Sequence, residues 1–269
     1  MRRWYLLIIF LICALLSPSA LFAKTKQRPR GPVLTEAQTK KALEKFLTPS
    51  QGAARAKEIL SDPRITLDPR VTGRGIKGGP PCDYFDPCFG LLSDASLDEG
   101  VAYRIQYQQY FDEAERLYGV PPEYILGILR VETKFGKRTG TWPVLRTLYS
   151  MYALIPRRRL FAAEQFAHFL KIADKNGLDL YETKGSIASA IGIPQFIPAS
   201  WSRWAVDGDN DGRIDLFTPP DAIVSIANYF YVHGWGVTDQ ERKDAVYSYN
   251  HSHRYVAAVI AYAEEVKNR

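Results

Sequence analysis

The chain has 269 residues, with 35 Lys or Arg against 29 Asp or Glu, and a formal net charge of +6. This mildly basic balance suits an anionic cell envelope and argues against nucleic acid as a partner. The length allows one large domain, or one domain with an accessory piece.

The first 23 residues have the layout of a secretory signal. Arg2 and Arg3 precede an apolar run, residues 4–16, and small residues then lead to Ala23, after which we expect cleavage. The run is short for a membrane span, although an uncleaved anchor stays open. Cys13 lacks a preceding small residue, which disfavours a lipoprotein. We expect an exported protein, periplasmic or associated with the cell envelope, of about 246 residues (269 − 23) with a charge of +4 (6 − 2).

An N-terminal extension, residues 24–95, is expected to contain short helices and irregular segments. Thr35 and Gln38 make a capping box for a first helix, and a second helix covers residues 53–60. Residues 61–95 are rich in proline and glycine, which predicts irregular structure there.

Two cysteines, Cys82 and Cys88, lie in that irregular stretch. In an oxidising compartment, such a pair favours a disulfide that staples the loop. A metal site is the alternative, but no other cysteine or nearby histidine completes four ligands.

Two helices are expected next. A long one begins at Ser96, where Ser96 and Glu99 form a capping box, and ends at Gly119. The other runs from Pro121, where two prolines suit the first turn, to Gly136.

The second of these helices carries a carboxyl group on its apolar stripe. Ile125, Ile128, Leu129 and Glu132 share one face at helical spacing. A carboxyl facing a core is desolvated, so its pKa rises, and a general acid working near neutral pH needs a raised pKa. A Glu at the core edge paired with arginine is an equal alternative at this point. The charged residues expected off the stripe are Glu123, Arg130 and Lys134.

Two later segments carry polar groups that need partners. Arg157, Arg158 and Arg159 stand at the start of a helix, where cations do not suit the macrodipole, so they face either an anionic partner or solvent. Residues 185–204 combine small residues and prolines, which indicates tight packing. Gln195 in this apolar stretch requires a hydrogen bond to backbone or ligand.

An acidic loop resembles the opening of an EF-hand and predicts a structural calcium site. Oxygen ligands fall at its first, third and fifth positions, a glycine at the sixth and a carbonyl at the seventh. Thr218 replaces the usual final glutamate, and an aspartate three residues later is the obvious substitute. All-oxygen ligands favour calcium, whereas an ion-free turn rich in aspartate is the alternative. The predicted ligands are Asp207, Asp209, Asp211, Asp221 and the carbonyl of Arg213.

The remaining segments are also expected to be helical. One helix includes Ile223 and Phe230 and ends at Gly234, and the last lies within residues 245–266. Because alternation typical of strands is scarce, we expect a mainly α fold, with a compact domain at residues 96–269.

Six stretches, taken in order, resemble the lytic murein transglycosylases, specifically the B-type family. The matching stretches are VETKFG (131–136), PRR (156–158), GSIASAIGIPQFIPASW (185–201), the acidic loop (207–221), DAIVSIANYFYVHGW (221–235) and SYNHSHRY (248–255). The resemblance implies a lysozyme-like, mainly α catalytic domain.

The resemblance also implies a reaction. These enzymes cleave the β-1,4 bond between N-acetylmuramic acid (MurNAc) and N-acetylglucosamine (GlcNAc) of peptidoglycan without water, and leave a 1,6-anhydro ring. Glu132 matches the single catalytic acid and base, so no second carboxylate is needed as a nucleophile.

Further residues match positions that bind the substrate or the metal. Arg157 and Arg158 match basic residues that meet acidic peptide stems, and the acidic loop matches the family's calcium loop. The implied partners are glycan strands and peptide stems, and envelope machinery is a further possibility. We expect a monomer without an organic cofactor. The positions that match the sugar-binding groove are Ser186, Gln195, Phe196, Tyr229, Tyr249, Asn250 and Tyr255.

The chain departs from the family pattern in three places. About ten residues replace a small β subdomain between Trp235 and Ala245, which leaves exo or endo preference open. Pro194 stands where the family has glycine, and Arg130 where a small residue is common.

Three other functions fit the sequence less well. A lysozyme-type hydrolase would need a second carboxylate that the motifs do not supply, and a non-catalytic wall-binding protein would be expected to lack Glu132. A zinc peptidase fits poorly, because the four histidines do not form the required helical pair. Those histidines are His168, His233, His251 and His253.

Overall fold

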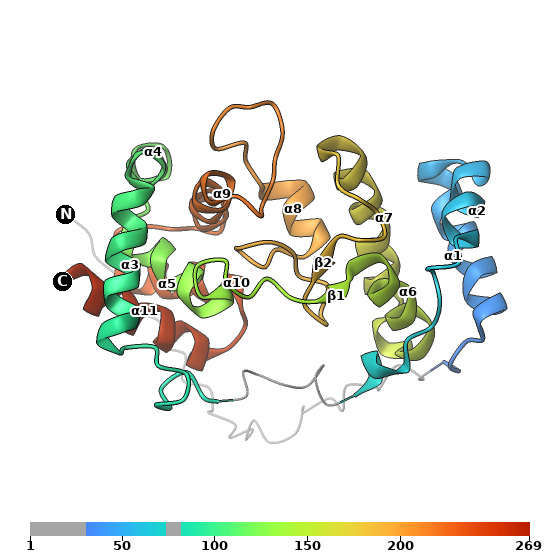
Figure 1. The fold of residues 1–269 in the computed structure, drawn as a ribbon, viewed down its shortest axis with the longest axis horizontal. Coiled ribbons are helices and arrows are strands. Elements are labelled where there is room, and N and C mark those ends of the chain that lie inside the picture. Colours follow the sequence, from blue (N-terminus) through green and yellow to red (C-terminus); the bar gives the residue numbers. More distant parts are fainter. Residues whose placement is uncertain (1–30, 74–81) are drawn as a thin grey trace, which may run out of the picture. The chain divides into compact units, whose positions relative to one another are not determined.

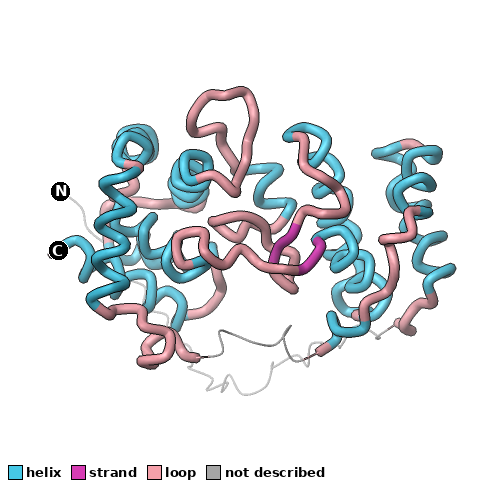
Figure 2. Tube along the Cα trace, viewed as in Figure 1, coloured by secondary structure: helices cyan, strands magenta, loops and turns pink. Residues whose placement is uncertain are grey.

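The computed structural model describes residues 31–73 and 82–269, so the signal predicted in residues 1–23 lies outside the described part (Figure 1). The described residues are mostly helical, as Figure 2 shows, and this confirms the mainly α expectation. No described helix combines the length and apolar character needed to cross a membrane. The helices are α1 (Glu36–Gln51), α2 (Ala53–Ser61), α3 (Asp94–Gln106), α4 (Gln108–Tyr118), α5 (Pro122–Thr133), α6 (Val144–Leu154), α7 (Arg159–Asn176), α8 (Pro198–Trp204), α9 (Pro219–Val232), α10 (Asp239–Tyr249) and α11 (His253–Lys267), with short 3-10 helices η1 (Pro69–Thr72) and η3 (Pro156–Arg158).

Two groups of helices pack around one hydrophobic core. In the first, α5 lies against α11 and also contacts α3, α4 and α9. In the second, α6 packs on α7, which packs on α8, and α1 contacts both α6 and α7. Two short antiparallel strands, β1 (Trp142–Pro143) and β2 (Lys184–Gly185), lie between the groups in Figure 1. Residues 31–269 form one compact unit.

The helix starts show how far local signals reach. The Thr35–Gln38 capping box is present at α1, which confirms that prediction. A second capping box, Thr238 with Glu241, opens α10 and was missed, although the residue pattern is visible in the sequence. Consequently α9 and α10 are separated by residues 233–238 alone.

The single long helix predicted from Ser96 to Gly119 is wrong: the structure has α3 and α4, with a break at Tyr107 (φ −114°, ψ 25°). The Tyr107 ring packs against Tyr103, with centroids 4.7 Å apart, and this contact accompanies the break. The N-cap is Ser93 instead of Ser96, because the Ser96 hydroxyl is buried and accepts a hydrogen bond from Arg130.

The predicted end of the central helix at Gly136 is also wrong. Helix α5 ends at Thr133, and Lys134 and Phe135 both adopt positive φ (50° and 57°). The Phe135 N–H donates to the Leu129 carbonyl at 3.0 Å, which closes the last turn. The chain turns early because the Phe135 ring is buried against Tyr103, with centroids 5.1 Å apart.

Candidate active site

Glu132 is the penultimate residue of α5, and its side chain is half-buried. Tyr255, near the start of α11, donates its hydroxyl proton to Glu132 Oε1 at 2.6 Å. Burial raises the pKa of Glu132 from 4.5 to about 7, although the Tyr255 hydrogen bond acts in the opposite direction. A carboxyl with this pKa is present in both protonation states near neutral pH, so it can donate a proton and later accept one.

The groups around this carboxyl are phenols. Tyr249 and Tyr255 stack with centroids 6.4 Å apart, and Tyr84 meets Tyr255 edge-on at 6.1 Å. Burial raises the pKa of all three hydroxyls, and the charge of Glu132 adds to the effect. They are therefore neutral at physiological pH. No ion pair to Glu132 exists among the described residues, so the alternative of a structural Glu–Arg pair finds no support there.

The pKa of Glu132 predicts a pH-dependent difference in stability between the wild type and Glu132→Gln. Because the folded-state pKa is raised, the folded protein resists ionisation, and wild-type stability falls as pH rises from 4.5 through about 7. Gln does not titrate and keeps a carbonyl for Tyr255. We expect similar melting temperatures at about pH 5 and a variant more stable by up to about 3 kcal/mol at about pH 9. Thermal melts at both pH values measure this, and equal melts at the higher pH would contradict it.

Two charged residues of α5 that lie off the apolar stripe are nevertheless buried. Glu123 and Arg130, expected off the apolar stripe, are only 8% and 3% exposed. Glu123 forms an ion pair with Lys267 at 3.4 Å. Arg130 donates to the carbonyls of Phe89 and Gly90, from a loop preceding α3. The face opposite the stripe is therefore also covered, by α11 and by that loop.

The predicted groove residues separate into a buried floor and a more accessible set. Phe196 and Tyr229 are 2% and 7% exposed, and their rings lie 5.5 Å apart. Tyr249 packs on both, and its hydroxyl donates to the Pro194 carbonyl at 2.5 Å. Together with the stacked Tyr255, these rings form a continuous aromatic cluster from Glu132 toward α9.

Gln195 and Ser186 lie in tight turns on the segment between β2 and α8. Gln195 has a positive φ of 52°, and its Nε2 donates to the carbonyls of Thr139 and Gly192. Its Oε1 makes no hydrogen bond with a described residue, so it can accept one from a ligand. Ser186 Oγ accepts the Ala190 N–H at 3.1 Å. Each side chain is thus held by neighbouring backbone groups.

The structure does not bring every predicted residue to the carboxyl. Asn250 is the exposed C-cap of α10. Arg157 and Arg158 lie in η3, which packs on α6 and α7, and no hydrogen bond or ion pair of the described residues links them to Glu132. Arg157 is exposed, and Arg158 lies over the Phe161 ring at 5.7 Å. Both cations are available to an anionic ligand.

Three carboxylates of the predicted calcium loop converge. The ligand atoms of Asp207, Asp209 and Asp221 lie within 4.8 Å of one another. Asp221 is 2% exposed, and burial raises its pKa to about 6, with a contribution from the neighbouring acids. Asp211 is not part of this group, and its carboxylate accepts the Arg213 N–H at 2.8 Å. Converging carboxylate oxygens without nitrogen or sulfur suit a hard cation such as calcium.

Tyr84, Trp204 and His233 join the site but were not predicted. The His233 ring stacks on Tyr229 at 3.9 Å, and Trp204 meets Tyr229 at 5.0 Å. The helical spacing of Tyr229 and His233 could have indicated this stack. Tyr84 follows Cys82 by two residues, and nothing in the sequence indicates that it would reach the acid.

Comparison with known proteins identifies the family. The family model described as Transglycosylase SLT domain matches residues 81–242. Membrane-bound lytic murein transglycosylase B of Escherichia coli K12 is 41% identical over 150 residues, which are 56% of this chain and 42% of that protein. This chain therefore spans less than half the length of that relative.

Solved structures agree with the match. The lytic transglycosylase Slt35 of Escherichia coli, in complex with calcium, has a TM-score of 0.77 at 26% identity, covering 86% of this chain and 93% of that one. SltB1 of Pseudomonas aeruginosa has a TM-score of 0.75 at 25% identity, covering 86% and 98%. The lysozyme-like expectation is thereby confirmed. With more than half of its residues matched by the family model, the chain belongs to the transglycosylase SLT domain family of lytic transglycosylases.

Proposed function

We propose that this protein is a lytic murein transglycosylase that cleaves the β-1,4 bond between MurNAc and GlcNAc in peptidoglycan and forms 1,6-anhydro-MurNAc. The observation that carries the proposal is Glu132, a single half-buried carboxyl with a pKa of about 7 and a phenolic hydrogen-bond donor. The relative in Escherichia coli is itself named a lytic murein transglycosylase, which supports the same activity here.

One carboxyl is sufficient for this reaction. Protonated Glu132 gives its proton to the glycosidic oxygen as the bond from C1 of MurNAc to that oxygen breaks. The resulting carboxylate, stabilised by the Tyr255 hydrogen bond, then takes the proton of the MurNAc C6 hydroxyl as O6 bonds to C1. Glu132 ends protonated, and no water is consumed. No carboxylate of a described residue is among the causes that shift the pKa of Glu132, which favours this reaction over that of a retaining hydrolase.

The substrate would lie next to Glu132, along the aromatic cluster formed by Phe196, Tyr229, Tyr249 and Tyr255. Gln195 offers a free carbonyl oxygen, and Tyr249 a partly exposed ring, to the sugars. Ser186 and Asn250 would bind at the edges, with Phe196, Tyr229 and Tyr255 as the floor. Arg157 and Arg158, which form no ion pair with a described residue, would meet acidic peptide stems. In support, Slt35 has been solved with bulgecin A bound.

We also propose that the acidic loop binds a structural calcium ion. Asp207, Asp209 and Asp221 already converge, and Asp211 with the Arg213 carbonyl would complete the site by a small rearrangement. The calcium complex of Slt35 supports this assignment. The mechanism above requires no organic cofactor.

The same proposal places the protein in the periplasm or at the cell envelope, where its polymeric substrate is found. It would act as a monomer on glycan strands, alone or with other envelope proteins. Cys82 and Cys88 are bonded to each other, which suits an oxidising compartment.

Mass spectrometry of the products tests the function. The purified protein, incubated with isolated peptidoglycan, is expected to release muropeptides with anhydro-MurNAc ends, each one water lighter than a reducing end. Reducing-end products would identify a hydrolase and contradict the proposal. No product at all would point to a wall-binding protein.

A further inference from the structure

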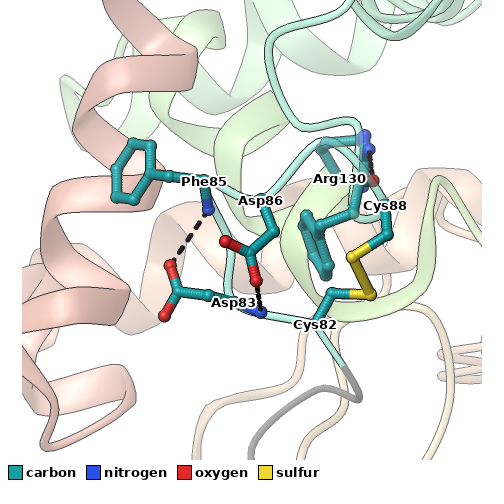
Figure 3. The surroundings of a disulfide bond; sticks show 7 residues. Cys82, Asp83, Phe85, Asp86, Cys88 and Arg130 are labelled. Atoms are coloured by element: carbon teal, nitrogen blue, oxygen red, sulfur yellow. Dashed lines mark hydrogen bonds between the residues drawn. A yellow bond between two sulfur atoms is a disulfide. The ribbon is translucent and has the colours of Figure 1, made fainter.

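A disulfide-stapled loop reaches the active site from the N-terminal side. Cys82 and Cys88, with Cα atoms 6.1 Å apart, close the loop shown in Figure 3. Inside it, the Asp86 carboxylate accepts the Asp83 N–H at 3.0 Å, and the Asp83 carboxylate accepts the Phe85 N–H at 3.2 Å. The stapled loop, defined as residues 82–90, is therefore held by its own hydrogen bonds as well as by the disulfide.

Arg130 of α5 holds this loop in place through hydrogen bonds. Its guanidinium is buried, and Nη2 donates to the carbonyls of Phe89 and Gly90 at 2.9 and 2.8 Å, as Figure 3 indicates in part. Nε donates to Ser96 Oγ, and burial lowers the pKa of the arginine. A buried cation is costly unless it is hydrogen-bonded, so the loop carbonyls and the guanidinium hold each other in place. Arg130 lies two residues before Glu132 on α5.

A second set of contacts ties the stapled loop to α11. The Asp83 carboxylate forms an ion pair with Arg254. Tyr84 packs edge-on between Phe89 and Tyr255, with centroids 5.4 and 6.1 Å away. Tyr255 is the residue that donates to Glu132. The loop thus contacts the hydrogen-bond donor of the acid directly.

We propose that the stapled loop is a positioning element of the active site: Arg130 and the disulfide hold Tyr84 against Tyr255, and Tyr84 keeps Tyr255 on Glu132 and shields the carboxyl from water. Of the measurements below, only the kinetics of muropeptide release rest on the proposed function, whereas the titration of Glu132 does not. The titratable groups that face the carboxyl are Tyr84 from the loop, Tyr249 from α10 and Tyr255 from α11. Since all three are neutral, the loop acts on Glu132 through water exclusion and hydrogen-bond geometry.

The disulfide makes the arrangement dependent on oxidation. Cys88 is exposed, so a reductant can reach the bond. Cys13, in the predicted signal, is the third cysteine of the sequence, so the exported protein would have no competing thiol. Reduction should loosen the stapled loop and withdraw Tyr84 while leaving the helical core intact.

The test compares Tyr84→Ala and Tyr84→Phe with Phe85→Ala, a neighbouring residue of the loop that is 46% exposed. The pKa of Glu132 is measured by difference infrared titration of the carboxyl, with Glu132→Gln as the blank. We expect Tyr84→Ala to move it from about 7 toward 4.5 by about one unit, because the access of water, which acts on the larger cause of the shift, outweighs the weakened Tyr255 hydrogen bond, whose loss acts in the opposite direction. Muropeptide release by that variant should fall about tenfold in kcat, with its pH profile shifted likewise. Tyr84→Phe keeps the ring and should rescue both properties, and Phe85→Ala should change neither.

Reduced wild type, and a Cys82→Ser/Cys88→Ser variant, should behave as Tyr84→Ala does. An unchanged titration in Tyr84→Ala and in reduced protein would overturn the inference and leave the loop a purely structural feature. If Tyr84→Ala does not fold, the titration of Glu132 in reduced, folded wild type decides whether the stapled loop has a positioning role. If wild type releases no anhydro products, the proposed function fails, while the titration still tests the positioning role.

Discussion

Glu132→Gln is expected to abolish release of anhydro muropeptides, lowering kcat by about 10³-fold or more, because the amide can neither give nor take the proton. In the proposed mechanism the same carboxyl serves both steps, so the loss would affect bond cleavage and ring closure together. Binding to insoluble peptidoglycan, measured by cosedimentation, should persist, since the Gln carbonyl can still accept the Tyr255 hydrogen bond. Kinetics on isolated peptidoglycan with product mass spectrometry give the result.

Glu123→Gln is the matched control for this variant. It makes the same chemical change on the same helix, at a residue that lies nine positions before Glu132 (132 − 123) and pairs with Lys267. It should keep wild-type kcat, with at most a small loss of stability. Substantial turnover by Glu132→Gln, with Glu123→Gln unchanged, would remove Glu132 from the role of acid.

Local patterns in the sequence singled out Glu132 as a candidate acid, with a structural Glu–Arg pair as an equal alternative. The helical spacing of α5 puts Glu132 on the same face as Ile125, Ile128 and Leu129, which are buried. The Thr35 capping box likewise needed nothing beyond four residues. Where a helix ends, however, depended on the burial of Phe135 and Tyr107, which are contacts with distant rings. Such boundaries follow from tertiary packing.

The environment of the acid was beyond the reach of the sequence. The sequence places Arg130 off the apolar stripe, but a periodic pattern shows which face is apolar and not what covers the opposite one. Its burial depends on Phe89 and Gly90, about forty residues away in the chain. Tyr84 reaches Tyr255 across 171 residues (255 − 84), by way of a loop without periodic structure. The family resemblance supplied the groove residues, and it omitted this loop because the loop has no counterpart in the pattern.

Calcium is expected to stabilise the fold strongly. Without an ion, the carboxylates of Asp207, Asp209 and Asp221 face one another, and burial holds the pKa of Asp221 at about 6. That raised pKa means that stability without calcium falls as pH rises from about 4 to 6. A bound calcium ion favours the ionised carboxylate of Asp221, and this reverses the sign of the pH dependence of stability. Adding calcium at about a hundredfold excess over Kd should stabilise the folded protein by about 2.7 kcal/mol and raise Tm by about 5–10 °C.

The Asp209→Asn variant distinguishes the stability that the ion contributes from the stability of the loop itself. Asp209 is exposed and accepts one weak hydrogen bond, from the Asp211 N–H at 3.3 Å, so its loss should barely change the melt in chelator. The calcium response should disappear, because the converging set loses one of its charges. Asp239→Asn, on an exposed first turn of α10, should keep the full response. Asp221→Asn is a poorer probe, since that carboxylate also accepts the N–H groups of Gly208 and Asp215 and is structural even without metal. A wild-type melt that does not respond to calcium would show that the acidic loop is an ion-free turn.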